Sequence, residues 1–171
     1  MYSILFLAFT QLALGEIVDR IEVVVDDQLI FSSEIELEER MSRYNPSPSP
    51  FWSSQNKNPA QRLIDGAIIR KAAGTIRLYQ PTETQVTTRL NALKSQFSSE
   101  HEWQSFIRTW APEEASIRVV LIRQMVVERY LARTLKSDPK DVDVWLTECN
   151  DHVAQLRKHI EVRHIPLKKV R

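Results

Sequence analysis

Alternating apolar and polar positions mark both ends of this chain as β structure. Two short apolar runs, 21–25 and 28–31, flank the polar pair 26–27, and two such runs around a turn predict a β-hairpin. Near the other end, segment 159–166 alternates with period two, which predicts a further strand. Because a two-stranded hairpin alone is marginal in water, we expect this C-terminal strand to join the hairpin in one small antiparallel sheet.

Between these ends, apolar residues recur with the helical period, and a proline or a capping pair marks most helix starts. The pair Ser33 and Glu36 is the first such capping box. The longest helix is apolar on too many sides for one buried face, so we expect it to be central. Gly66 and Gly74 lie inside the second helix, where we expect close helix contacts. The fold class is therefore mainly α, a helical bundle with a small antiparallel sheet. The predicted helices are 33–41, 59–79, 82–96, 99–110, 112–135 and 138–158.

The first helix and the segment after it are both predicted to lie at the surface. The Pro/Ser-rich segment 45–58 cannot be α-helical, since each proline lacks a donor and restricts the residue before it. We expect an extended, exposed loop there. The acidic side chains of the first helix are interpreted as solvated charge. They are Glu34, Glu36, Glu38 and Glu39.

Aromatic residues form the candidate binding surface. Trp103, Phe106, Ile107 and Trp110 recur at the spacing of one helix face, and most of this stripe is expected in the core. Amphipathic aromatic surfaces also hold extended apolar peptides. The candidate peptide-binding residues are therefore Trp103, Phe106, Trp110 and Trp145.

Composition and charge exclude several classes of site. The formal net charge of +1 gives no overall reason to expect a nucleic-acid partner, although residues 167–171 form a basic tail. Three glycines cannot supply a phosphate-binding loop, and the single cysteine, Cys149, excludes an internal disulfide and a cysteine-based zinc cluster. The four histidines share no metal-binding motif. We therefore expect neither a metal nor another cofactor.

The first fifteen residues have the pattern of an export signal. Residues 4–14 are almost entirely apolar. Ala13 and Gly15 are small residues at the −3 and −1 positions of a signal-peptidase cleavage site. The run is shorter than the roughly 20 residues that span a bilayer. We expect residues 1–15 to be a cleaved signal peptide and residues 16–171 to form one exported domain without stable membrane insertion. A buried N-terminal strand or helix is the alternative.

The order of these elements resembles the N-terminal domain of SurA-type periplasmic chaperones. In that family an entry hairpin runs into a capped helix, which corresponds here to 21–34. The helix segment "LIDGAII" at 63–69 and the turn "PTETQV" at 81–86 follow in the same order. At the other end, "QLR" at 155–157 and "IEVR" at 160–163 are similar to the family's C-terminal segment, a helix that leads into a strand.

The resemblance, which covers residues 17–166, implies a non-catalytic periplasmic chaperone for unfolded exported proteins, outer-membrane proteins among them. Family members usually carry one or two parvulin prolyl-isomerase domains between these parts. The linker 136–138 is too short to hold one, so we expect no isomerase activity. The implied partners are unfolded polypeptide clients, and the four aromatic residues above are the implied client-binding groups.

Two other functions fit the same residues. The segment "VRHIPL" at 162–167 can open a parvulin domain with His164 as its first active-site histidine. The chain would then be a truncated or non-catalytic partner of a prolyl isomerase. The other alternative is an envelope adaptor that binds one folded partner. The interpretation of this segment as a C-terminal strand is preferred, because only that gives the hairpin a third strand.

Overall fold

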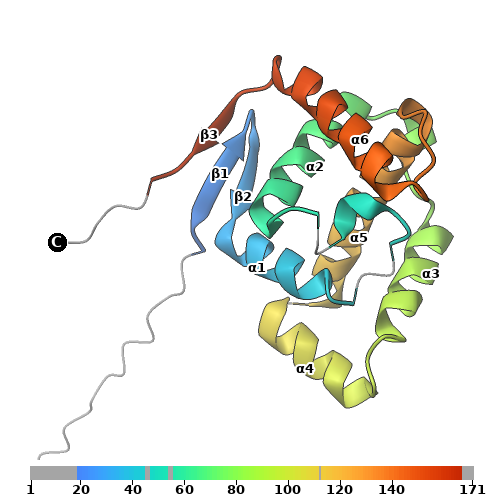
Figure 1. The fold of residues 1–171 in the computed structure, drawn as a ribbon. Coiled ribbons are helices and arrows are strands. Elements are labelled where there is room, and N and C mark those ends of the chain that lie inside the picture. Colours follow the sequence, from blue (N-terminus) through green and yellow to red (C-terminus); the bar gives the residue numbers. More distant parts are fainter. Residues whose placement is uncertain (1–18, 45–46, 54–55, 112, 167–171) are drawn as a thin grey trace, which may run out of the picture.

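The computed structural model describes residues 19–44, 47–53, 56–111 and 113–166. The predicted signal peptide and basic tail lie outside this part. Helices and a three-stranded antiparallel sheet build the described chain (Figure 1), so the predicted fold class is confirmed. The helices are α1 (Ser32–Met41), α2 (Pro59–Ala73), α3 (Glu83–Lys94), α4 (Glu100–Trp110), α5 (Glu114–Thr134) and α6 (Val142–Arg157), with short 3-10 turns η1 (Pro50–Trp52) and η2 (Arg77–Tyr79).

The sheet joins the two ends of the described chain, as predicted. Val24 of the central strand pairs with Leu29 on one side and Arg163 on the other. Asp26, at the hairpin turn, has a φ of 51°, a conformation that Asp tolerates better than most residues. Its N–H donates to the Glu161 carbonyl at 2.8 Å, and its carboxylate accepts the Glu161 N–H at 2.7 Å. The turn therefore holds the start of the third strand. The strands are β1 (Ile21–Val25), β2 (Gln28–Phe31) and β3 (Val162–His164), in the order β2-β1-β3.

Asp19, rather than Ser33, caps the first helix. The helix α1 begins one residue before Ser33, and the Ser33 N–H donates to the Asp19 carboxylate at 3.2 Å. The Glu34 carboxylate accepts the Phe31 N–H at 3.1 Å. The predicted capping box of Ser33 and Glu36 is therefore wrong. A carboxylate from the segment before the hairpin accepts one free N–H of the first turn, that of Ser33.

Two predicted helix boundaries are also corrected. The helix α2 ends at Ala73 and not near 79, because Gly74 has a φ of 55°, in the left-handed region that favours glycine. The prediction that Gly74 lies inside the helix at a close contact is therefore wrong, since a Cβ atom there would meet nothing within 4 Å. Gly66 lies inside α2 as predicted. A Cβ atom there would lie 3.0 Å from the Trp52 ring, so the close contact is with an aromatic side chain rather than another helix. The last helix begins at Val142 instead of 138.

The predicted exposed loop at 45–58 contains core residues instead. Phe51 and Trp52, both in the turn η1, are fully buried. Closely spaced prolines exclude an α-helix, but they allow this tighter turn, in which Pro50 takes the first position. The Trp52 ring packs over Gly66 of α2, where no side chain stands in its way. The loop therefore contributes to the core rather than covering it.

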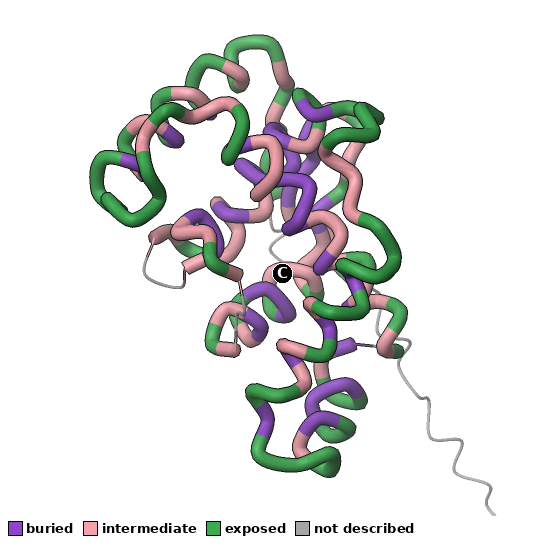
Figure 2. The backbone as a smooth tube through the Cα atoms, turned by 90° about the vertical axis from the view of Figure 1, so that its right-hand side faces the viewer, coloured by how far each residue is buried: buried purple, intermediate pink, exposed green. Residues whose placement is uncertain are grey.

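The core consists of two apolar clusters that α5 connects. One cluster lies between the sheet, η1, α2 and α6, and the other between α1, α3 and α4. Val127 and Leu131 of α5 belong to the first cluster, while Ile117 and Leu121 belong to the second. Figure 2 shows buried stretches alternating with exposed turns along the helices. The longest helix is therefore central, as predicted, although Val119 on its outer side is exposed.

Candidate functional site

Three of the four aromatic residues predicted to bind clients are core residues. Trp103, Phe106 and Trp145 are only 1%, 7% and 3% exposed. Trp110 is half-buried, and the Arg40 guanidinium lies 4.4 Å from the centre of its ring. Trp103, Phe106 and Trp110 share α4, whereas Trp145 packs in the other cluster. The stripe on α4 is therefore mainly a packing face, and Trp110 is its accessible part.

The apolar pocket beside Trp145 is the candidate binding site. The end of α5, the start of α6, the linker between them and the segment before η1 form it. Trp145 and Leu131 are its buried wall, and Ala132 is exposed at its rim. It encloses about 220 Å³. Its lining residues are Pro48, Ser49, Glu128, Leu131, Ala132, Leu135, Ser137, Pro139 and Trp145.

Glu148 of α6 holds the linker that forms one wall of this pocket. Its carboxylate accepts the N–H groups of Lys136 and Ser137, each at 2.9 Å, and the Ser137 hydroxyl at 2.5 Å. These hydrogen bonds, that of the Ser137 hydroxyl first, lower the pKa of Glu148 to about 2. A carboxylate that stays charged at neutral pH therefore fixes the chain between α5 and α6.

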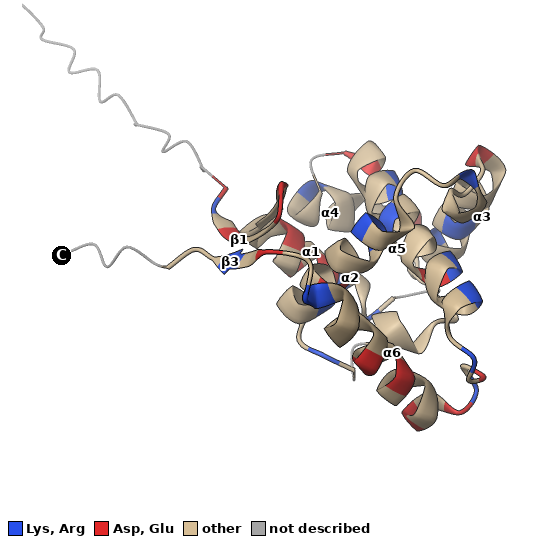
Figure 3. Cartoon of the chain, turned by 90° about the horizontal axis from the view of Figure 1, so that it is seen from above, with Lys and Arg blue, Asp and Glu red and all other residues tan. Residues whose placement is uncertain are grey.

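On the other side of the pocket, the charge of Glu128 is neutralised by Arg89. Arg89 of α3 donates twice to the Glu128 carboxylate, at 3.0 and 2.9 Å, and the Ser47 hydroxyl donates to it at 2.6 Å. Lys and Arg positions outnumber acidic ones along α5, whereas Asp and Glu positions predominate along α6 (Figure 3). Because helices of opposite sign flank the pocket, no single charge attracts a ligand there, and apolar contact dominates.

The size of this pocket suits a single apolar side chain. Sites for small molecules usually enclose about 300 to 1,000 Å³, which is more than the space beside Trp145. Leu131 and Leu135 supply apolar contacts, while the hydroxyl groups of Ser49 and Ser137 line the same pocket. A polypeptide can therefore place one side chain inside the pocket.

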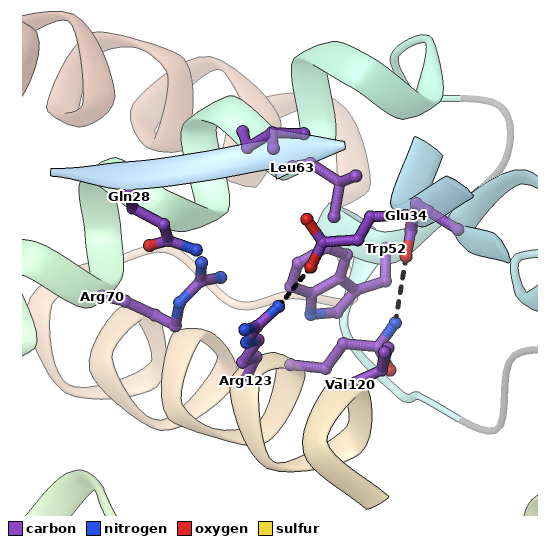
Figure 4. A pocket seen from close by; sticks show the side chains of 10 residues that line it. Gln28, Glu34, Trp52, Leu63, Arg70, Val120 and Arg123 are labelled. Atoms are coloured by element: carbon purple, nitrogen blue, oxygen red, sulfur yellow. Dashed lines mark hydrogen bonds and ion pairs between the residues drawn. The ribbon is translucent and has the colours of Figure 1, made fainter. Parts of the chain in front are cut away.

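A second, polar pocket lies beneath β2, between α1, α2 and α5 (Figure 4); we call it the polar slot. Glu34 pairs there with Arg123 at 2.6 Å, and the neighbouring Glu38 pairs with Arg62 at 2.9 Å. Burial raises the pKa of Glu38, against the opposing effect of Arg62. Arg70 also lines the slot, and its guanidinium has no hydrogen bond or ion pair among the described residues.

The interpretation of the acidic residues of α1 as solvated charge is wrong for Glu38. Leu37, Glu38 and Met41 form the buried face of this helix, and Glu38 and Arg62 are only 2% and 1% exposed. Positions 34, 37, 38 and 41 follow the spacing of one helix face, which is the signal that could have identified Glu38. The identity of its partner, on α2, depends on tertiary structure.

Other reactive groups are not assembled into sites in the part of the chain that the structure describes. Cys149 is buried, which raises the pKa of its thiol to about 12, so it is a core residue. His152 is half-buried and within 3.1 Å of the Tyr130 hydroxyl. Within the described residues, no group of three or more His, Cys, Asp or Glu is arranged to hold a metal ion. The exposed histidines are His101, His159 and His164.

The evidence for a function of this chain consists of the two pockets and the sequence resemblance. No protein-family model matches this chain, and no curated protein matches it. No helix in the described ranges combines the length and the apolar character needed to cross a bilayer.

Proposed function

We propose that this chain is a non-catalytic chaperone that holds unfolded exported proteins in the periplasm, outer-membrane proteins among them. The observation that carries this proposal is the open apolar pocket beside Trp145, whose volume suits one apolar side chain. The sheet between the hairpin and β3 also supports it, because the resemblance to SurA-type chaperones implies that connection.

The chemistry of the pocket suits many unrelated clients. Burial of apolar surface favours binding whatever the identity of the side chain. Reversible binding of this kind lowers the concentration of free unfolded chain by mass action. It needs no covalent step and no cofactor.

Filling the pocket tests this function. In Ala132→Trp, a bulky ring replaces an exposed side chain at the rim, so we expect weaker protection of a denatured outer-membrane β-barrel protein against aggregation. The melting temperature should stay close to that of the wild type. Ala115→Trp is the matched control, because Ala115 is exposed on the same helix, α5, away from the pocket.

Three results would reject the proposal: no protection by the wild type at stoichiometric excess, prolyl isomerisation above background on a short peptide, or equal protection by Ala132→Trp and the wild type. A capture from envelope extract separates the classes further. Many unfolded proteins would support a chaperone, and a single folded partner at fixed stoichiometry would instead identify an adaptor.

A further inference from the structure

The polar slot contains hydrogen-bonding groups that the described part of the chain does not satisfy. The Arg70 guanidinium on α2 has no partner there, and neither has the side-chain amide of Gln28 on β2. The Oε1 atom of Gln124 on α5 is buried and unpaired, in a side chain only 3% exposed. Buried polar groups are nearly always hydrogen-bonded in native proteins. Arg70 and Gln28 are only half-buried, so their hydrogen-bonding groups are accessible to a ligand in the slot.

The charges in and beside the slot leave one positive charge uncompensated. Glu34 neutralises Arg123, and Glu38 neutralises Arg62, so Arg70 is the excess cation. Burial, followed by the nearby charge of Arg123, lowers the pKa of Arg70 to about 10. An arginine nevertheless remains protonated at neutral pH. In the protein alone, the partly buried charge of Arg70 has no full compensation, which is unfavourable. An anion bound beside Arg70 would therefore stabilise the folded protein.

The donors in the slot lie close together. Figure 4 shows the side-chain ends of Gln28 and Arg70 side by side, with the end of Arg123 nearby and the Trp52 ring on the side of Glu34. Apolar side chains also line the slot, beside Glu34, Glu38 and Gln124, and they weaken competition from water and strengthen a charge-assisted hydrogen bond. The apolar lining residues are Ile30, Trp52, Leu63 and Val120.

We infer that the polar slot binds a carboxylate group, with Arg70 as its principal partner. A planar guanidinium presents two parallel N–H groups that match the two oxygens of a carboxylate. The slot offers about 20 Å³, which is room for one or two water-sized groups and too little for a large ligand. One excess positive charge matches a monoanion, whereas the Glu34 carboxylate would repel a phosphate dianion.

The small volume of the slot admits only the carboxylate end of a ligand. The Gln124 Oε1 atom has almost no exposed surface, so a ligand in the slot meets Arg70 and Gln28 and not this atom. Two sources carry such a carboxylate: a small carboxylic acid, and the last residue of a polypeptide. The lining residues of the slot and of the pocket beside Trp145 do not overlap, so this inference does not depend on the proposed chaperone function.

Thermal unfolding of the full chain tests the slot, because a ligand that binds only the folded state raises the melting temperature in a saturable way. At constant ionic strength, we expect acetate and glycolate to raise it, and chloride to have no saturable effect. The Arg70→Met variant should lose these responses. Arg108→Met is the matched control, because Arg108 is exposed on α4 and distant from the slot lining.

A short peptide distinguishes the two sources. Binding of the peptide acid, with at least a tenfold loss on amidation of its C-terminus, would assign the slot to polypeptide ends, whereas binding of glycolate alone would assign it to small acids. If Arg70→Met does not fold, Gln28→Leu at the same cluster of donors should weaken glycolate binding. Equal responses of these variants and the wild type, or no saturable response to any carboxylate, would overturn the inference.

Discussion

Glu38 and Arg62 show how one pair of residues can determine how three helices pack. The Arg62 Nε atom on α2 donates to Glu38 on α1 at 2.9 Å, and Gln124 on α5 donates to the same carboxylate at 3.3 Å. Both charged side chains are almost completely removed from water. Such a pair adds little net stability compared with apolar residues, but removal of one partner leaves a buried charge alone.

Arg62→Met should therefore lower the free energy of unfolding by about 3 to 5 kcal/mol. Urea denaturation measures this change. Adding Glu38→Gln should recover part of the loss, because the second substitution removes the unpaired charge and keeps an oxygen for Gln124. The inference of a buried ion pair fails if Arg62→Met is as stable as the wild type, or if the double variant is less stable than the single one.

Glu148 should make stability depend on pH. Its pKa is lowered from 4.5 to about 2 in the folded protein, so the unfolded chain takes up its proton first as the pH falls. The contribution of Glu148 is therefore fully present above about 4.5 and is lost as the pH falls towards 2. Glu148→Gln should be less stable than the wild type at pH 7, and the difference should shrink at low pH.

Denaturant unfolding at several pH values measures this difference for Glu148→Gln. The matched control is Asp151→Asn on the same helix, because the Asp151 carboxylate is exposed and accepts no hydrogen bond within the described residues. It should leave the pH profile unchanged. A constant gap between Glu148→Gln and the wild type from pH 7 to pH 3 would contradict the assignment of Glu148 as the charged acceptor for the linker.

At the scale of elements, β3 is the part whose role depends most on its neighbours. It has three residues and a single neighbouring strand, β1, in the described chain. Beyond the ladder, the Ile165 N–H donates to the Glu22 carbonyl at 2.9 Å, and Asp26 holds Glu161 at the other end. Without β3, the edge of β1 would offer free N–H and C=O groups to other chains.

Deleting residues 159–171 should therefore lower the melting temperature and cause loss of cooperative unfolding or aggregation. Deleting only 167–171 is the matched control, because it leaves β3 intact, and it should melt like the full chain. Calorimetry and light scattering record both outcomes. If the longer deletion melts as sharply and at the same temperature as the full chain, the third strand has no structural role.

At the scale of the whole molecule, α5 joins the two halves of the core, since its ends belong to different apolar clusters. The candidate pocket lies at the C-terminal end of α5, and the polar slot lies along its middle. This arrangement places both sites on the helix that connects the two clusters. Sites on well-packed helices are held more accurately than sites on loops, which favours binding without a large change of shape.

The proposed periplasmic location makes a prediction about the mature chain. If residues 1–15 are a signal peptide, mass spectrometry of the native protein should find Glu16 at the N-terminus, because signal peptidase cleaves after the small residue Gly15. The protein should also fractionate with the periplasm. A chain that starts at Met1 in the cytoplasm would contradict export and remove the location on which the client class depends.

The sequence alone determined the features that nearby residues control. The pair Thr82 and Gln85 caps α3, with the Thr82 N–H donating to the Gln85 side chain at 2.9 Å. The hairpin likewise forms around its two-residue turn. In these cases every partner lies within a few residues, so spacing and residue type were sufficient. Alternation of apolar and polar residues near the C-terminus also indicated β3. Because a two-stranded hairpin alone is marginal in water, the sequence also indicated that β3 pairs with the hairpin.

Tertiary structure decided which residues form the sites. Trp145 was a sequence candidate, but its pocket also needs Pro48, and that residue comes from the other end of the described chain. Glu38 meets Arg62 across 24 positions of sequence, and Trp52 enters the core because Gly66 leaves room for its ring. Such contacts depend on which helices become neighbours, and local periodicity carries no information about that choice.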